Sequence, residues 1–300
     1  MALHIEDYGE KIGLYEPYEK YRDDYPSGTV MEAEISEMLI LLNAPDGFYF
    51  PTPKKPYNSE ECMNFLRFFL NVSMPFTICD RLIELIDHFL AHYQKYKHVE
   101  SLNSLESIKN SWKCSKIKNP ELLFLWKGDI TLLEVDAIVN AANSQMLGCF
   151  HPLHKCIDNC IHTFAGPRLR NDCSLIMQEQ GNEEPNGHAK ITRAYNLPSK
   201  FVVHTVGPVF DESIQKECEQ ELRSCYISCL SECAKIQSIN SIAFCCISTG
   251  VFLFPNDRAA EIAVATVDEW LTNNPGRFSH IVFNVFLNKD QVLYSKIFDE

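Results

Sequence analysis

Residues 135–159, VDAIVNAANSQMLGCFHPLHKCIDN, hold the two patterns that decide how this chain folds and which chemistry its central region can carry. The first pattern, Val135 to Asn143, is an apolar run that ends in polar amides, which is typical of a strand buried on both faces. The second, Gly148 to Asn159, places two thiols, an imidazole and a carboxylate within a dozen residues. We therefore expect a buried strand that is followed by a reactive loop.

Three side chains of the second pattern form a candidate zinc site. Cys149, His154 and Cys156 are spaced Cys-x4-His-x-Cys, and thiolate and imidazole are ligands that zinc prefers. Three protein ligands leave one coordination position open to water or substrate. This is typical of a catalytic zinc site rather than a structural one. Two alternatives stay open: two buried cysteines with a surface histidine, or a cysteine nucleophile beside a histidine.

Asp158 lies two residues after Cys156, in the first turn of an expected helix. A carboxylate so close to a metal ligand can orient or deprotonate a water molecule. The alternative is a first-turn acid that the helix dipole stabilises. Spacing leaves both interpretations open.

Further from this stretch, apolar runs and helical patterns alternate along the chain. Such alternation predicts an α/β layered domain with a largely parallel sheet. The other apolar runs are Leu122 to Trp126, Phe201 to Val206, Ile242 to Ile247 and His280 to Leu287; the helical patterns are Cys156 to Arg170, Ile214 to Ile236, Asp257 to Asn273 and Lys289 to Phe298.

The N-terminal third has a different pattern. An irregular arm, residues 1 to about 27, precedes helical stretches at Thr29 to Leu42, Glu61 to Asn71 and Cys79 to Tyr96. Polar residues from Glu100 to Asn119 form the expected linker. We predict a helical N-terminal extension over residues 1–110 and an α/β domain over residues 120–300.

Composition excludes several classes of protein. A net charge of −13 argues against a general nucleic-acid binder, which would show clustered Lys and Arg. No apolar run approaches the ~18 residues that a membrane span needs. Thirteen cysteines without an apolar signal segment indicate free thiols in the reducing cytoplasm.

Polar loops follow three of the expected strands. In open α/β sheets ligands bind outside the carboxyl ends of the strands, so these loops predict one crevice. An aspartate there can accept from an exocyclic amine, asparagines suit ribose hydroxyls, and glycine-loop amides can cradle phosphates. Each loop alone is also an ordinary turn. The loops hold Gly128 and Asp129, Asn140 and Asn143, and Ser248 to Phe252.

Together these residues resemble the macrodomain family, whose members bind ADP-ribose. The resemblance covers residues from about Leu122 to Phe298 and implies a three-layer α/β/α fold with a mixed, mostly parallel sheet. Its specific stretches are Gly128 to Thr131, Val139 to Ser144, His204 to Pro208 and Ser248 to Phe252.

The resemblance also implies roles for single residues. Asp129 and Ile130 correspond to adenine contacts, and Asn140 and Asn143 to distal-ribose contacts. Asp158 aligns with an aspartate implicated in catalysis, and we place Asn143 beside it as a catalytic candidate. The diphosphate cradle corresponds to Ser248, Thr249, Gly250, Val251 and Phe252.

The chain departs from the family pattern at two places. Gly148 to Asn159 replaces a glycine-rich loop, and the family frame returns at Ile161 to Gly166. This replacement resembles the zinc-containing macrodomain subgroup, microbial protein-ADP-ribose hydrolases often linked to sirtuin-type ADP-ribosyltransferases. In that subgroup Cys-His-Cys ligands hold a catalytic zinc, and a helical extension precedes the macrodomain. Leu253 stands where many macrodomains carry glycine, which bears on loop flexibility rather than on binding.

These resemblances imply zinc-dependent hydrolysis of mono-ADP-ribose from modified protein side chains. The expected cofactor is Zn²⁺, and the expected partners are a mono-ADP-ribosylated protein and a sirtuin-type ADP-ribosyltransferase system. One alternative is a non-catalytic ADP-ribose reader in which zinc only holds the loop. Another is deacetylation of O-acetyl-ADP-ribose.

Overall fold

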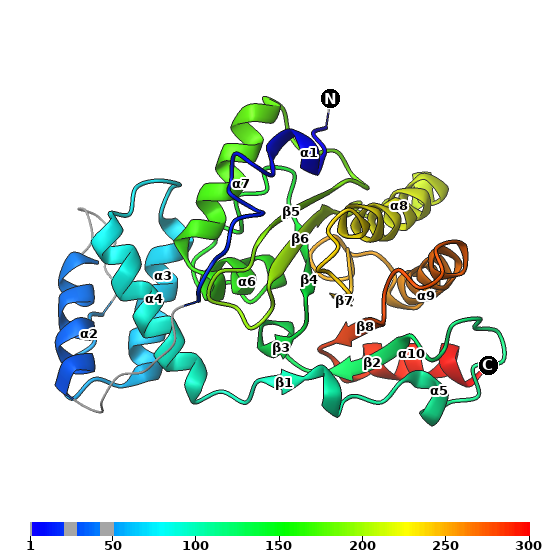
Figure 1. Ribbon diagram of the computed structural model, residues 1–300, viewed down its shortest axis with the longest axis horizontal. Coiled ribbons are helices and arrows are strands. Elements are labelled where there is room, and N and C mark those ends of the chain that lie inside the picture. Colours follow the sequence, from blue (N-terminus) through cyan, green and yellow to red (C-terminus); the bar gives the residue numbers. More distant parts are fainter. Residues whose placement is uncertain (1, 21–28, 43–50) are drawn as a thin grey trace.

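The computed structural model describes residues 2–20, 29–42 and 51–300 (Figure 1). Its centre is a six-stranded sheet of order β2-β8-β7-β4-β6-β5. Neighbouring strands are parallel, except that β5 runs antiparallel to β6. The strands are β2 (Leu123–Lys127), β4 (Ala137–Ala142), β5 (Ala189–Arg193), β6 (Phe201–Val206), β7 (Ser241–Phe244) and β8 (His280–Val285).

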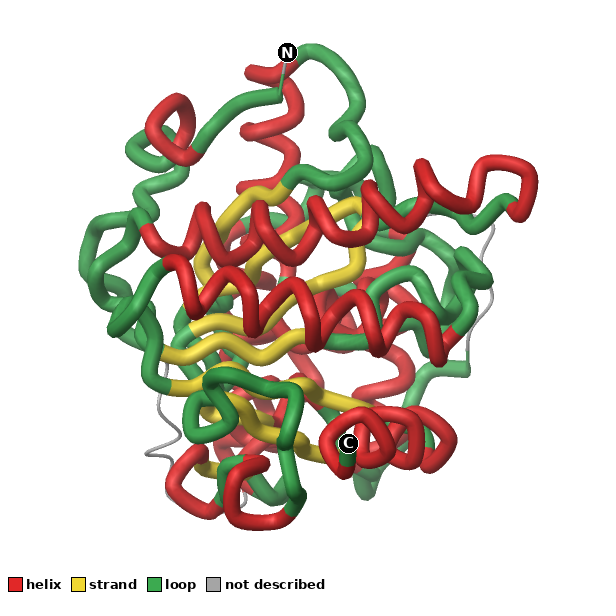
Figure 2. Tube along the Cα trace, turned by 90° about the vertical axis from the view of Figure 1, so that its right-hand side faces the viewer, coloured by secondary structure: helices red, strands yellow, loops and turns green. Residues whose placement is uncertain are grey.

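Helices cover both faces of this sheet, which confirms the predicted three-layer α/β fold. The helices α8 (Gln215–Ala234) and α9 (Asn256–Asn273) lie on the face that Figure 2 presents. On the opposite face lie α6 (Ile157–Ala165) and α7 (Pro167–Gln180). The last helix, α10 (Asn288–Asp299), packs beside α9 and against β2 and β8. None of the helices in the described ranges is long and apolar enough to cross a bilayer.

The strands form where the apolar runs predict them, because both faces of the sheet are covered. In β4, residues Ala137 to Val139 are fully buried, which fits a central parallel strand. The loops after β2, β4 and β7 all leave the sheet at the carboxyl edge. This edge therefore receives the polar loops that the sequence places after each strand.

A three-helix unit, which we call the helical unit, lies beside α6 (Figure 1). It has its own apolar core, to which Met38, Leu66 and Ile86 contribute. Its helix α3 begins after Asn58, whose side chain accepts from the backbone N–H of Glu60 and Glu61, an N-cap arrangement. The unit consists of α2 (Thr29–Leu41), α3 (Ser59–Val72) and α4 (Asp80–Lys95).

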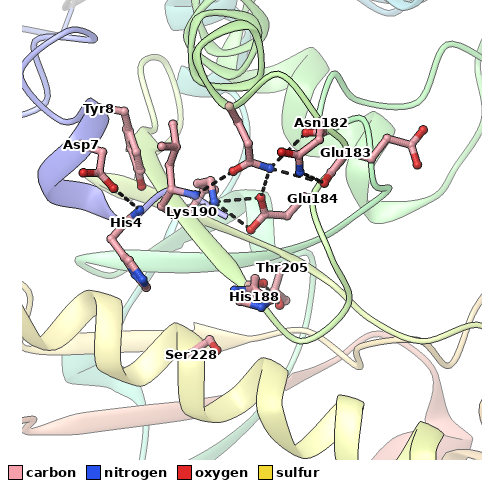
Figure 3. A network of polar contacts seen from close by, with 12 residues as sticks. His4, Asp7, Tyr8, Asn182, Glu183, Glu184, His188, Lys190, Thr205 and Ser228 are labelled. Atoms are coloured by element: carbon pink, nitrogen blue, oxygen red, sulfur yellow. Dashed lines mark hydrogen bonds and ion pairs between the residues drawn. The ribbon is translucent and has the colours of Figure 1, made fainter. Parts of the chain in front are cut away.

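The expected irregular arm is more ordered than its sequence suggests. Its short helix α1 (Ile5–Tyr8) buries Ile5 and Tyr8 in the core of the sheet domain. Lys190 of β5, paired with Glu184, donates to the carbonyl of Leu3 at 2.8 Å (Figure 3). We call residues 2–16 the N-terminal arm; residues 1 and 21–27 of the predicted arm lie outside the described residues.

Other local predictions need correction. The expected linker is packed: β1 (Glu100–Ser101) pairs with β3 (Leu133–Glu134), and α5 (Ile108–Ser111) buries Ile108. The single helix expected from Cys156 to Arg170 breaks into α6 and α7. Gly166 has a φ of 88°, and Pro167 occupies the first turn of α7, where its missing N–H has no cost.

Candidate functional site

Two asparagines and one aspartate meet at the carboxyl edge of β4. Asn140 Nδ2 donates to Asp158 Oδ1 at 2.8 Å, and Asn143 Nδ2 lies 3.3 Å from Asp158 Oδ2. Asn143 also donates to the carbonyl of Gly148 and accepts from the N–H of Gln145. The structure thus brings the predicted ribose-contact and catalytic residues together, with both carboxylate oxygens held in place.

Asp158 is buried at the first turn of α6, with 5% of its surface exposed. Burial raises the pKa of this carboxyl to about 6, although the hydrogen bond from Asn140 opposes the shift. His162 Nε2 lies 3.5 Å from Asp158 Oδ1. Burial also lowers the pKa of His162 well below its usual range, so its ring is neutral. The site therefore holds a carboxylate that can gain or release a proton near neutral pH.

One acceptor atom of this cluster has no partner within the described chain. Asn140 is fully buried in β4, and its Oδ1 receives no hydrogen bond. Its Nδ2 is fixed by Asp158 and by His204 Nδ1, which lies 3.1 Å away. His204 Nε2 in turn lies 2.9 Å from Thr192 Oγ1. A buried unpaired acceptor is costly, so Asn140 Oδ1 fits a hydroxyl donor of a ligand.

The three predicted metal ligands meet in the ligand loop, which we define as residues 148–156. Cys149 Sγ lies 3.6 Å from His154 Nδ1, and the ligand atoms of Cys149, His154 and Cys156 lie within 4.8 Å of one another. Tetrahedral zinc with ordinary Zn–S and Zn–N bonds separates sulfur from nitrogen by about 3.6 Å. The chemistry and the spacing of the three residues therefore fit zinc.

The surroundings of the ligand loop bear on the role of Cys156. Burial raises the pKa of the Cys156 thiol to about 12, which argues against this thiol as an activated nucleophile. Cys156 is also the N-cap of α6, where its Sγ accepts from the N–H of Asn159. Gly148 has a φ of 82°, and a Cβ there would lie 2.8 Å from the ring of His162, so the loop requires glycine at its start.

Asp129 and Ile130 follow β2. Asp129 Oδ1 accepts from Thr131 N at 3.0 Å and from Thr131 Oγ1 at 2.7 Å, so this oxygen serves as a local cap. Ile130 as a whole residue is 2% exposed and belongs to the core. A ligand at this end would therefore meet the second oxygen of Asp129.

The loop from Ser248 to Phe252, the predicted diphosphate cradle, is exposed at its tip. Ser248 has a φ of 63° and a buried Oγ without a partner among the described residues. A Cβ on Gly250 would meet nothing within 4 Å, and Val251 is 67% exposed. Thr249 Oγ1 donates back to the carbonyl of Cys246. Free space beside Gly250 leaves room for an anionic ligand group at the backbone of this loop, whereas the Ser248 hydroxyl is buried against Gly207.

Neighbouring residues explain two sequence features of this cradle. A Cβ on Gly207, after β6, would lie 2.1 Å from Ser248 Oγ, so glycine allows the two loops to approach. Leu253 has a φ of 56° and is 74% exposed. Glycine adopts this left-handed conformation more readily than leucine does. The replacement of the usual glycine by Leu253 therefore bears on the backbone conformation of the loop.

Sequence reasoning did not assign two buried histidines that support the site. His162 could have been found from its i, i+4 spacing to Asp158, which places both on one helix face. His204 reaches Asn140 only through the register between β4 and β6. That register is not readable from the sequence before the strands are paired.

Comparisons with known proteins agree with this geometry. The family model for the Macro domain matches residues 139–263. A protein of Treponema medium named protein-ADP-ribose hydrolase is 46% identical over 246 residues, 81% of this chain and 89% of the relative. That span is longer than residues 120–300 alone can supply, so the similarity extends into the N-terminal region.

Two further relatives extend the comparison. A protein of Fusarium oxysporum f. sp. cubense named "Probable bifunctional ADP-ribose hydrolase/ADP-ribosyltransferase" is 42% identical, covering 72% of this chain and 37% of the relative. The crystal structure of a Trypanosoma brucei macrodomain in complex with ADP has a TM-score of 0.56 and 26% identity. It covers 88% of this chain and 95% of the other.

Proposed function

This chain belongs to the macrodomain family, and on that premise we propose that it hydrolyses mono-ADP-ribose from modified protein side chains, with zinc bound by Cys149, His154 and Cys156. The hydrolase activity is supported by the Treponema medium relative, which is similar over most of the chain. One observation of the structure carries the proposal furthest: Asn140 and Asn143 hold both oxygens of a buried Asp158 beside the ligand loop.

The ligand would lie across the carboxyl edge of the sheet. Asp129 and the backbone of Ile130 contact the adenine, and the loop Ser248 to Phe252 surrounds the diphosphate. Asn140 Oδ1 accepts from a hydroxyl of the distal ribose, which gives the orphan acceptor its partner. This pose brings the anomeric carbon to Asp158 and the ligand loop.

Asp158 acts as the general base in this proposal. Its carboxylate orients a water molecule toward the anomeric carbon and takes up the proton as the bond to the protein side chain breaks. A raised pKa strengthens the carboxylate as a base while it stays ionised near neutral pH. A zinc ion on the ligand loop would supply a Lewis acid that polarises a ribose hydroxyl or water.

Two substitutions test the proposal. Cys149→Ala should lose zinc and hydrolysis, while ADP-ribose binding largely survives because the adenine and diphosphate contacts lie elsewhere. Asp158→Ala should keep zinc and lower turnover at least on the order of a hundredfold, more than it lowers affinity. The measurements are metal content, calorimetric ADP-ribose binding and release of ADP-ribose from a modified protein.

The same assays separate the alternatives. Robust binding without release of ADP-ribose from differently linked substrates would assign the chain as a reader. Release of acetate from O-acetyl-ADP-ribose, detected by mass spectrometry without cleavage of protein-linked ADP-ribose, would assign a deacetylase. Full hydrolysis by a metal-free Cys149→Ala variant would remove zinc from the mechanism.

We also propose a setting for this activity. The Fusarium relative combines the hydrolase and ADP-ribosyltransferase names in one chain, which supports a functional link to an ADP-ribosyltransferase, of sirtuin type in our proposal. All thirteen cysteines are free thiols, and zinc ligation by cysteine requires reduced thiols. The need for reduced thiols favours the cytoplasm as the place of action.

A further inference from the structure

The helical unit contributes hydrogen bonds to the ligand loop. We propose that α3 is a working part of the metal site, in which Arg67 and Asn71 are positioning residues that hold the ligand loop in its ligating geometry. This inference rests on the zinc role proposed above. It gives the N-terminal third of the chain a function in the activity of the macrodomain.

Arg67 contacts the loop directly. Its Nη2 donates to the carbonyl of His154 at 2.6 Å and to Asn159 Oδ1 at 3.0 Å. Its Nε donates to the same Asn159 oxygen at 3.2 Å, and Cys160 Sγ lies 3.4 Å from Nη2. One guanidinium therefore fixes the backbone of a proposed zinc ligand and the amide of Asn159.

Asn159, which Arg67 holds in place, forms further hydrogen bonds with the ligand loop. Its side chain is fully buried, and its Nδ2 donates to the carbonyls of Cys149 at 3.2 Å and His151 at 3.1 Å. Its backbone N–H donates to Cys156 Sγ at 3.4 Å. Arg67 is therefore connected to His154 directly and to Cys149 and Cys156 through Asn159.

Asn71 lies one helical turn after Arg67 and holds a second point of the loop. Its Oδ1 accepts from the backbone N–H of Leu153 at 2.9 Å, and its Nδ2 donates to Thr163 Oγ1 at 3.2 Å. Leu153 immediately precedes His154 and has a φ of 56°. Such a conformation is uncommon for leucine and persists where the surroundings enforce it.

Arg170 of α7 ties the end of α3 to the start of the loop. It donates to the carbonyl of Ser73 at 2.6 Å and also bonds the carbonyl of Leu70. On its other side it donates to the carbonyl of Leu147 at 2.8 Å, and its guanidinium lies over the ring of Phe150. The loop is thus held against α3 at both ends and in the middle.

This arrangement matters for metal binding because ligand atoms must be held closely to their coordination geometry. Partners that orient metal ligands change metal affinity by about 10–100-fold when they are removed. Arg67 and Asn71 orient the ligand loop in this way, although they lie on a helix more than 80 residues earlier in the chain. We therefore expect loss of these side chains to weaken zinc binding without touching a ligand.

The test compares three variants of the full chain. Arg67→Met removes the donors and keeps the aliphatic stem, and Asn71→Leu removes the amide. Arg81→Met is the matched control: Arg81 belongs to the helical unit but pairs on the surface with Glu37 and Glu84. Zinc dissociation constants are measured by chelator competition, and cobalt spectra report the ligand geometry.

We expect Arg67→Met and Asn71→Leu to bind zinc on the order of tenfold more weakly than wild type and to alter the cobalt charge-transfer bands. Arg81→Met should match wild type. Arg67→Lys, which keeps the charge but not the forked donors, serves if Arg67→Met does not fold.

The inference would be overturned if folded Arg67 and Asn71 variants showed wild-type zinc affinity and cobalt spectra. It would also be overturned if the wild-type protein bound no zinc. Weakened zinc binding in a protein that never hydrolyses ADP-ribosylated substrates would instead refute the proposed function alone.

Discussion

Breaking the ion pair between Lys190 and Glu184 should destabilise the fold more than any exposed charge change. Lys190 Nζ and the Glu184 carboxylate lie 2.8 Å apart, and both side chains are fully buried. The substitution Lys190→Met keeps the aliphatic stem and removes the ammonium. It leaves a buried carboxylate whose other partner is Gln180 Nε2, and it removes the donor to the carbonyl of Leu3.

The magnitude follows from this burial. Removing one member of a buried pair costs about 3–5 kcal/mol, since the remaining charge stays uncompensated. The lost bond to Leu3 adds about 1 kcal/mol of the same sign. We expect the free energy of unfolding to fall by about 4–6 kcal/mol near neutral pH.

Urea unfolding followed by tryptophan fluorescence measures this change. Lys116→Met is the control, because Lys116 and Glu300 are 72% and 61% exposed, and such a surface pair contributes less than about 1 kcal/mol. The double variant Lys190→Met/Glu184→Met should recover much of the loss, since no charge is left buried. A Lys190→Met protein within about 1 kcal/mol of wild type would refute the reasoning.

Three further predictions concern the site and its supports. Gly148→Ala should lower stability by about 1–3 kcal/mol, because alanine strains a φ of 82° and meets the ring of His162; an unchanged urea midpoint would contradict it. Asn140→Ala should weaken ADP-ribose binding on the order of tenfold in calorimetry, since it removes the orphan acceptor; equal affinity would dismiss the proposed ribose contact. Burial raises the pKa of Asp172, which accepts from Tyr195, to about 7. The folded state thus holds this proton more tightly than the unfolded chain, so stability is full below about pH 4 and falls by roughly 4 kcal/mol as pH rises through about 7. Urea midpoints at about pH 5 and pH 8 should show a smaller difference for Asp172→Asn than for wild type, and an equal difference would exclude Asp172 as the cause.

The sheet could be predicted where burial on both faces produces continuous apolar runs. β5 could not, because it alternates Lys190 and Thr192 with apolar residues and all of them are buried. Those polar side chains are satisfied by partners elsewhere, Glu184 for Lys190 and His204 for Thr192. Pattern reasoning takes such residues as exposed, and only the assembled fold supplies their partners.

The residues of the site also differ in whether they could be predicted from the sequence. Asn140, Asn143 and Asp158 lie within 18 residues of one another along the chain, and strand-end logic is enough to bring them together. Arg67 and Asn71 lie in another part of the chain and approach the loop only because the helical unit packs against α6. Composition marks neither residue, since isolated arginines and asparagines on an amphipathic helix are ordinary.

The N-terminal arm has a consequence for self-association. β5 is an outer strand of the sheet, and exposed outer strands offer unpaired N–H and C=O groups to other chains. Tyr8 Oη accepts from the N–H of Ile191 at 2.7 Å, and the bond from Lys190 to Leu3 fastens the arm in place. The arm therefore blocks one open side of the sheet against edge-to-edge aggregation.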